Sequence, residues 1–345
     1  MERLGVLVLA YGTPSHEDEI EPYYRDIRGG QAPPPELLEE LKARYRAIGG
    51  RSPLTEITER QARALAQALA RRGLGEVRPY VGMKHWHPRI EEAVRAMAAD
   101  GVRRAIGVVM APQYSRRSVG EYAERIEEAR RRVAGAPEVE LVPSWHDEPA
   151  FLDVLAARVR GALARLGAPA DGPGAASVIF TAHSLPAAVA AEGDPYPAQL
   201  EEMARGVAAR AVLSRWSTAY QSAGRRAVPW LGPDVLERMR EEAAAGARAI
   251  IICPAGFVAD HLEVLYDIDV ECAQLARELG VAFARTASLN DDPAFIEALA
   301  DAVQRRARAA GAAGAAGAAA SAGGDGRGAE GEAGAGPGAG GEAGA

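Results

Sequence analysis

The chain has 345 residues, a formal net charge of −7 and a hydrophobic content of 48%. This length suits two domains of ordinary size or one large one, and the hydrophobic content supports a substantial core. A mildly acidic chain without a basic stripe argues against nucleic acid as the main ligand. The two cysteines, Cys253 and Cys272, indicate buried thiols in a reducing cytoplasm, and two cysteines cannot supply the four thiolates of a usual iron–sulfur cluster.

Short apolar runs alternate with longer amphipathic segments along the chain. The first run, residues 5–11, is too short to span a membrane and lacks a cleavage signature, so we interpret it as the first strand of a cytoplasmic protein. Helical patterns occupy residues 88–101, 119–133, 199–211 and 233–246. The alternation predicts βαβ units and parallel sheets. We expect eight strands, at residues 5–11, 77–83, 105–112, 139–144, 177–183, 217–222, 249–255 and 281–286.

An internal repeat indicates two similar halves. The segment "SWHDEPAFLDVLAARV" begins at Ser144 and "SLNDDPAFIEALADAV" begins at Ser288, an offset of 144 residues. Upstream, "GVRRAIGVVMAP" matches "GARAIIICPA" at a nearly equal offset. We therefore predict an N-terminal α/β half at residues 1–150 and a C-terminal half at 151–308. A ligand is expected between the two halves, bounded by strand ends from both.

The tail, residues 309–345, contains no aromatic residue and no Ile, Leu or Val. Such a segment cannot bury enough apolar surface to offset the entropy lost on ordering, so we predict that it is disordered.

Three acids stand four residues apart in "GFVADHLEVLYDIDVEC", namely Glu263, Asp267 and Glu271. Carboxylates at this spacing repel one another on a helix. A charge row is usually a solvated helix face, but no Lys or Arg occurs between Arg248 and Arg277 to neutralise this one. The row also follows an apolar run typical of a buried strand, and ligands gather beyond the carboxyl ends of such strands. Its oxygens, spread over roughly 12 Å, are suited to lead a cation inward.

His183 directly follows the apolar run "SVIFTA" and is a second candidate. A histidine after a strand is often a structural group, but a neutral imidazole also binds metals and accepts protons. If the halves face each other, His183 and Glu263 come from corresponding places on opposite walls. The chain has no glycine-rich phosphate loop, dinucleotide fingerprint, Cys-x-x-Cys pair or His-Glu-x-x-His helix. Nucleotide and zinc-protease chemistry therefore lack their usual motifs.

Several motifs together resemble those of the ferrochelatase family, over roughly residues 3–308. The resemblance is strongest to the bacterial branch that inserts ferrous iron into coproporphyrin III. It implies two Rossmann-like halves with parallel four-stranded sheets around a porphyrin cleft, as in class II chelatases. The motifs are "LAYGTP", "ELKARYRAIGGRSPL", "GMKHWHP", "TAHSLP", "GDPYPAQL", "PWLGPDV" and "GFVADHLEVLYDIDVEC".

The resemblance implies a role for ten residues. His183 and Glu263 match the catalytic pair that handles the metal, and Asp267 and Glu271 match a proposed outer metal site. Two positions depart from the family pattern: Gly29 stands where a second arginine is frequent, and Gln113 where a histidine is frequent. The positions that match contacts to the macrocycle are Tyr11, which is also a possible axial ligand, Arg28, Arg44, Tyr45, Ser52 and Tyr122.

The implied activity is that of a lyase of haem biosynthesis, with coproporphyrin III and Fe²⁺ as substrates. The resemblance implies no required cofactor, a monomer, and transient contact with the next enzyme of haem synthesis. Some relatives hold a [2Fe–2S] cluster, but the count of two cysteines argues against one here. The polar segment 25–45 replaces an apolar, membrane-contacting lip, which favours coproporphyrin over protoporphyrin IX. Three alternatives stay open: a protoporphyrin IX ferrochelatase, a sirohydrochlorin-type cobalt or iron chelatase, and a non-catalytic porphyrin carrier.

Overall fold

The computed structural model describes residues 3–172, 174–224 and 228–322. The chain divides into two compact units, residues 1–306 and 307–345, and the first unit contains the predicted N-terminal half and residues 151–306 of the C-terminal half. Helix α11 (Pro293–Ala322) continues past residue 309, so the first part of the segment predicted to be disordered is helical. The rest of that prediction, residues 323–345, lies outside the described residues.

The fold contains two four-stranded parallel sheets with the same topology. The strand order is β2-β1-β3-β4 in the first sheet and β6-β5-β7-β8 in the second. This confirms the predicted strands and parallel sheets, with strand ends that differ from the prediction by at most three residues. The strands are β1 (Leu4–Ala10), β2 (Val77–Met83), β3 (Arg104–Val109), β4 (Glu138–Val142), β5 (Ser177–His183), β6 (Trp216–Gln221), β7 (Ala249–Cys253) and β8 (Ala282–Arg285).

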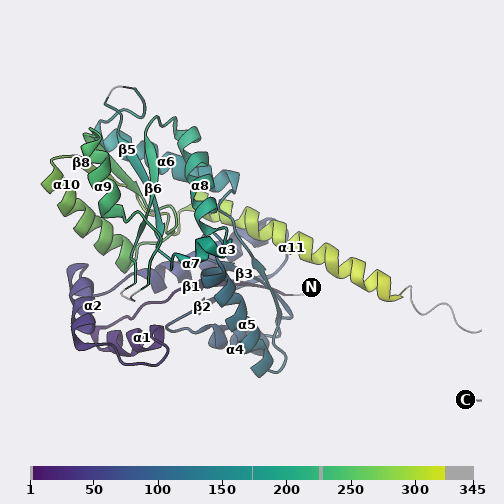
Figure 1. Ribbon diagram of the computed structural model, residues 1–345. Helices are drawn as coiled ribbons and strands as arrows, with labels where there is room; N and C mark the ends of the chain where they lie inside the picture. Colours follow the sequence, from purple (N-terminus) through teal and green to yellow (C-terminus); the bar gives the residue numbers. More distant parts are fainter. Residues whose placement is uncertain (1–2, 173, 225–227, 323–345) are drawn as a thin grey trace, which may run out of the picture. The chain divides into compact units, whose positions relative to one another are not determined.

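Helices cover the sheets and complete the layers. Helices α4 and α5 pack on one face of the first sheet, where α4 buries Ile90, Val94 and Met97 against Leu7 and Leu9. Figure 1 shows α9 and α10 on one side of the second sheet and α6 and α8 on the other. The helices before α11 are α1 (Ile20–Ile27), α2 (Pro35–Ala47), α3 (Leu54–Arg71), α4 (Ile90–Ala99), α5 (Glu121–Arg132), α6 (Pro149–Leu166), α7 (Ala188–Ala191), α8 (Tyr196–Ala211), α9 (Val235–Ala244) and α10 (Ala273–Leu279), with a 3₁₀-helix η1 (Glu17–Glu19) and two π-helices, η2 (Arg116–Gly120) and η3 (Val264–Cys272).

Local sequence signals account for the ends of several helices. At the start of α9 the Asp234 side chain accepts a hydrogen bond from the Leu236 backbone N–H, at 2.9 Å, while Glu237 accepts one from the Asp234 N–H, at 3.2 Å. This capping box satisfies backbone donors that a helix N-terminus otherwise leaves free. Helix α6 ends at Gly167, whose φ of 61° is a left-handed conformation that glycine adopts at low cost.

The two repeated segments form α6 and α11 and meet in the core. Trp145, Phe151 and Phe295 are buried there, with ring centroids 4.8 Å apart for Trp145–Phe151 and 6.2 Å for Phe151–Phe295. Helix α6 packs on β7, β8 and α8, as its predicted place in the C-terminal half requires. Helix α11 was predicted in the same half, but Arg72 of α3 pairs with its Glu297 and Asp301, each at 2.6 Å. The last helix of the C-terminal half therefore also binds the N-terminal half.

Candidate active site at the junction of the two halves

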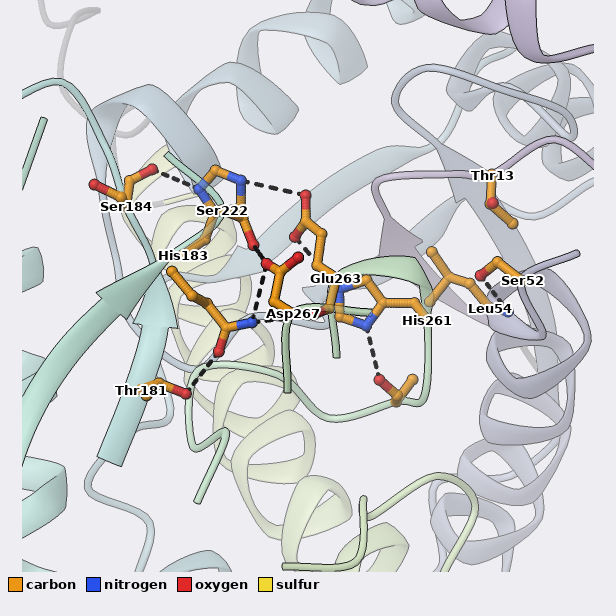
Figure 2. A network of polar contacts seen from close by, with 12 residues as sticks. Thr13, Ser52, Leu54, Thr181, His183, Ser184, Ser222, His261, Glu263 and Asp267 are labelled. Carbon is orange, nitrogen blue, oxygen red and sulfur yellow. Dashed lines mark hydrogen bonds and ion pairs between the residues drawn. The ribbon is translucent and has the colours of Figure 1, made fainter. Parts of the chain in front are cut away.

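His183 is the last residue of β5, after a run of buried strand residues. Its main-chain carbonyl accepts a hydrogen bond from the Tyr196 hydroxyl at 2.9 Å, and its ring Nδ1 contacts the Ser184 carbonyl. Because a carbonyl only accepts, Nδ1 is the donor there, and Nε2 is left to face the Glu263 carboxylate at 3.4 Å (Figure 2). The strand thus fixes the orientation of the imidazole and directs one nitrogen to Glu263.

Glu263 directly precedes the π-helix η3, after the loop that follows β7. Its second carboxylate oxygen lies 3.5 Å from Nε2 of His261, whose Nδ1 contacts the Ala259 carbonyl at 2.9 Å. The carboxylate therefore stands between two imidazoles, one from the end of β5 and one from its own loop. The sequence assigns His261 no role, because the position of a residue within a loop does not indicate where its ring points.

The charges of His183 and Glu263 stabilise each other. Burial alone would lower the pKa of His183, but the Glu263 carboxylate raises that pKa to about 9. Burial alone would raise the pKa of Glu263, but the His183 imidazolium holds it well below its usual range. The two side chains are 37% and 32% exposed, so solvent screens part of this attraction. At neutral pH the pair is an imidazolium and a carboxylate.

Asp267 follows Glu263 on η3 and is only 5% exposed. Its Oδ2 accepts a hydrogen bond from the Ser222 hydroxyl and lies 3.5 Å from the Gln221 amide nitrogen (Figure 2). Its Oδ1 lies 3.6 Å from the Arg44 guanidinium of α2. Burial, followed by the Glu263 charge, raises the pKa of Asp267 to about 7. The acid row is thus not a solvated helix face at this point, and the partner missing from its own segment is Arg44, in the other half.

Glu271 lies further along η3 and is partly buried. Its charge also raises the pKa of Asp267, which places the two carboxylates within electrostatic reach of each other. The outer metal site predicted at Asp267 and Glu271 stays a prediction. Within the ranges that the structure describes, no group of three or more His, Cys, Asp or Glu side chains is arranged to hold a metal ion.

Tyr11, Tyr45 and Tyr122 are the three tyrosines of the N-terminal half predicted to contact the macrocycle, and we call this group the aromatic wall. Tyr11 follows β1, is 42% exposed, and its ring lies 4.6 Å from that of His85. Tyr45 is buried in the last turn of α2, and its hydroxyl is 2.9 Å from that of Thr13. Tyr122 is buried near the start of α5. The Lys84 ammonium lies 5.9 Å from the centre of the Tyr11 ring and 5.6 Å from that of Tyr122.

The charge of Glu263, in the C-terminal half, affects the pKa values of two tyrosines of the aromatic wall. Although Tyr11 is 42% exposed, the protein around its hydroxyl and then the Glu263 charge raise its pKa, and burial together with the same charge raises the pKa of Tyr45. The Glu263 carboxylate therefore acts on tyrosines of the opposite half. Both halves therefore contribute side chains to this region, and Arg44 of the N-terminal half also reaches Asp267. The expectation that His183 and Glu263 lie on opposite walls is wrong, because both belong to the C-terminal half, where the paired strands β5 and β7 place them. Their catalytic roles stay a prediction.

The remaining predicted contacts are arranged less uniformly. Arg44 lies beside the site, because its guanidinium reaches Asp267 and stands 4.9 Å from the Tyr266 ring centre. Ser52 is buried, and its hydroxyl accepts a hydrogen bond from the Leu54 backbone N–H at 3.4 Å. Arg28 ends α1 with its guanidinium 5.9 Å from the Tyr24 ring centre, a contact within its own helix. That contact does not bring Arg28 to the His183–Glu263 pair.

Gln221 and Ser222 at the end of β6 are site residues to which the sequence assigned no role. Gln221 accepts a hydrogen bond from Thr181 at 2.8 Å and donates to the Glu263 carbonyl at 3.2 Å, so it links β5 to the start of η3. Ser222 has a φ of 60°, which non-glycine residues adopt rarely and mostly where function demands it. Their position at the end of the strand beside β5 was the available signal.

Comparison with solved structures defines the class of fold. The sirohydrochlorin chelatase SirB from Bacillus subtilis subspecies spizizenii, solved in complex with cobalt, matches with a TM-score of 0.53 at 11% identity. The match covers 89% of this chain and 96% of that chain. The two sheets therefore have the fold of a metal chelatase.

Sequence comparison then identifies the family. The family model described as Ferrochelatase matches residues 3–307. The ferrochelatase of Herpetosiphon aurantiacus is 44% identical over 297 residues, which cover 86% of this chain and 97% of that protein. The coproporphyrin III ferrochelatase of Geobacillus kaustophilus is 46% identical over 304 residues, which cover 88% and 95%. The chain belongs to the ferrochelatase family. None of its helices, within the described residues, has the length and apolar character needed to cross a membrane.

Proposed function

We propose that the protein inserts Fe²⁺ into coproporphyrin III and releases Fe-coproporphyrin III, a step of haem biosynthesis. The observation that carries this proposal is the 3.4 Å approach of His183, at the end of β5, and Glu263, which follows the loop after the paired strand β7. The family match and the relative named a coproporphyrin III ferrochelatase supply the substrate class. The Arg44 guanidinium of α2, which lies beside Asp267, is suited to bind one of the four carboxylates of such a porphyrin.

The His183–Glu263 pair is suited to exchange a metal ion for protons. In the resting protein His183 holds a proton because of Glu263. An arriving Fe²⁺ displaces this proton to solvent and is bound by one imidazole nitrogen and one carboxylate, ligands that suit a divalent iron. When the iron passes to the porphyrin, one pyrrole proton is transferred to His183 and restores the resting pair. The second pyrrole proton is released to solvent through another acceptor. The sum is Fe²⁺ plus a porphyrin with two N–H groups giving the iron porphyrin and two protons, with no change of oxidation state.

Asp267 is suited to take the second proton. Its pKa, raised to about 7 by burial and by Glu263, matches neutral pH, where a proton acceptor is most effective. Bending of the porphyrin is assigned to the walls, which would bind the distorted ring better than the flat one. Tyr11, which is exposed and faces the charge of Glu263, is placed as the axial contact on the opposite side of the ring.

In this proposal iron is a substrate, and no cofactor takes part. Both cysteines are free and buried, and burial raises the pKa of the Cys253 thiol to about 12 and also raises that of Cys272. Two cysteines are also fewer than the four thiolates of a usual iron–sulfur cluster. We propose that the protein acts as a cytoplasmic monomer and passes its product to the next enzyme by transient contact. Size-exclusion chromatography with light scattering tests the first part.

Anaerobic insertion of Fe²⁺ into coproporphyrin III, protoporphyrin IX and sirohydrochlorin tests the function. We expect multiple turnovers per protein, and the highest kcat/KM with coproporphyrin III. The same site should also insert Zn²⁺, because nitrogen and oxygen ligands bind Zn²⁺ more tightly than Fe²⁺. Preference for sirohydrochlorin would reassign the substrate, and binding without turnover would indicate a carrier. His183→Ala should abolish insertion while porphyrin still binds, and near-normal turnover would remove His183 from its role.

A further inference from the structure

The Asp194 side chain connects the two halves by hydrogen bonds, and it has no part in the metal and proton chemistry proposed above. It lies in the loop between α7 and α8 of the C-terminal half. Its Oδ2 accepts two hydrogen bonds from the N-terminal half, from the Ser115 hydroxyl at 2.9 Å and from the Arg116 backbone N–H at 2.8 Å. Its Oδ1 accepts a third from the Tyr196 backbone N–H at 3.0 Å. One carboxylate thus binds donors from both halves at once.

On the N-terminal side, these bonds hold the start of the helix that carries Tyr122. Ser115 is fully buried and caps η2, where its hydroxyl oxygen also accepts from the Arg117 backbone N–H at 3.2 Å. The chain passes from η2 directly into α5, which begins at Glu121 and contains Tyr122. Glu121 forms a short ion pair with Lys84, the ammonium that lies over both Tyr11 and Tyr122. The Asp194 carboxylate is therefore hydrogen-bonded to the segment that leads directly into the helix carrying Tyr122 of the aromatic wall.

On the C-terminal side, the same carboxylate reaches His183 through one residue. Tyr196 is buried, and its ring stacks against Tyr220 with centroids 6.4 Å apart. Its hydroxyl donates the 2.9 Å hydrogen bond to the main-chain carbonyl of His183. Tyr196 has few ways to move without breaking one of these contacts. The position of the His183 backbone is thus tied to Asp194.

A neighbouring contact shows how an ordinary surface pair at this junction differs. Glu192 and Arg117 also connect the halves, at 3.1 Å, but their side chains are 41% and 44% exposed. Exposed pairs of this kind contribute about 0–1 kcal/mol and constrain geometry little. Asp194 instead accepts three hydrogen bonds, two of them from backbone N–H groups and one from a fully buried serine.

We propose that Asp194 is a positioning residue that sets the distance between the aromatic wall and His183, through Ser115 and Arg116 on one side and Tyr196 on the other. This inference rests on the proposed function, since a fixed separation of the walls matters for a reaction that needs a bent ring and a metal-bearing imidazole at one place. Catalysis depends steeply on such placement, and small displacements of reacting groups lower the rate.

The test compares Asp194→Asn and Tyr196→Phe with the control Glu192→Gln, in Zn²⁺ and Fe²⁺ insertion assays with thermal unfolding measured in parallel. Asparagine keeps one acceptor oxygen, so it can bond one half but not both. We expect Asp194→Asn to lower kcat about tenfold or more at temperatures where the variant is fully folded, with the porphyrin KM changed less than threefold. Tyr196→Phe should lower kcat similarly, and the double variant should be no worse than the more severe single variant. Glu192→Gln should stay within twofold of the wild type.

Two results would overturn the inference. One is a lowered Tm for Asp194→Asn with an unchanged kcat per folded molecule, which would make the residue merely structural. The other is additive loss in the double variant, which would mean that Asp194 and Tyr196 act separately. A wild type that inserts no metal into any porphyrin would count against the proposed function instead. In that case NMR of the His183 ring in the free protein still decides, since its chemical shift should change in Asp194→Asn and stay constant in Glu192→Gln.

Discussion

Each half has a π-helix after the third strand of its sheet, but the two π-helices differ in length and in the residues beside them. In the first half η2 follows β3, has five residues and leads to Tyr122, while in the second half η3 follows β7, has nine residues and starts next to Glu263. π-Helices are rare and frequent at functional sites. The first half therefore presents aromatic surface and the second presents titratable groups. Under the proposed function, this difference would separate ring binding in the first half from metal and proton handling in the second.

Two histidines, the buried His85 and the partly exposed His183, show the same division. His85 lies against Tyr11 and bonds Asp26 at 2.8 Å, and burial, aided by the Lys84 and Arg125 charges, lowers its pKa to about 4. For His183 the effect of burial is outweighed by Glu263, and the pKa rises to about 9. At neutral pH one imidazole is neutral and the other is charged. Burial therefore dominates the pKa of His85, whereas the neighbouring Glu263 carboxylate outweighs it at His183.

The largest expected effect tests whether chemistry is confined to the second half. Glu263→Gln should lower kcat for metal insertion by roughly 10²–10⁴-fold, as expected for loss of a group that handles protons in the transition state. The matched control is Glu121→Gln, which changes the acid at the start of α5 in the first half. We expect the control to lose less than tenfold, measured at saturating porphyrin. Equal losses of kcat in the two variants would show that the chemistry is not confined to the second half.

The next prediction concerns the repeated helices. Phe151 of α6 and Phe295 of α11 are fully buried and contact each other. Each change to Ala should lower the free energy of unfolding by about 3–5 kcal/mol, as for other buried aromatic residues. Urea unfolding followed by circular dichroism measures this. Because the two rings touch, the double variant should lose less than the sum, and strict additivity would show that the helices do not share one core.

The opposite pKa shifts of the two histidines predict opposite dependence of stability on pH. His183 has a folded pKa of about 9, above its unfolded value of 6.5, so its contribution is present below pH 6.5 and is lost as pH rises through 9. His85 has a folded pKa of about 4, so stability is lost as pH falls below 6.5 towards 4. NMR titration of the imidazoles measures both. In Glu263→Gln the pKa of His183 should fall well below 9, and an unchanged value would assign the shift to another group.

The sequence predicted the fold because each signal was local. Every strand is a short apolar run, and the 144-residue offset of the repeat revealed the shared topology. It could not predict that α11 pairs with Arg72 of α3, since nothing in an amphipathic pattern states which sheet a helix will cover. Nor could the tail show that α11 continues to residue 322, because Ala and Gly carry no periodicity to interpret.

The same limit applies to the site. His183 and Glu263 were predicted on chemistry and resemblance, and the structure brings them together. Arg44 was expected to bind a porphyrin carboxylate, but without ligand it lies next to Asp267. That contact joins residues 223 positions apart and leaves no mark in either local segment. Long-range polar partners, such as Ser115 and Asp194, are the part of a site that one sequence does not display.

The smallest expected effect concerns Arg44. This residue belongs to the first half but contacts Asp267 of the second half, so it tests how far the two halves act separately. Its guanidinium contacts Asp267 at 3.6 Å, Tyr266 at 4.9 Å and Glu40 of its own helix at 3.2 Å. To hold a porphyrin carboxylate it must exchange some of these contacts for the substrate. Arg44→Gln should therefore raise the KM for coproporphyrin III about five- to tenfold and leave kcat within threefold, as loss of a partly exposed ion pair of about 1 kcal/mol predicts.

Arg46→Gln is the matched control for this prediction, because Arg46 lies on the same helix and pairs with Glu17 at the surface. The KM of the Arg46→Gln variant for coproporphyrin III should change by no more than twofold. The Arg44 charge also lowers the pKa of Asp267, so in Arg44→Gln the pKa of Asp267 should rise further. The apparent pKa in the pH profile of kcat should then move to higher pH if Asp267 accepts the second proton. A raised KM with an unmoved profile would keep Arg44 as a binding residue and assign that proton to another acceptor.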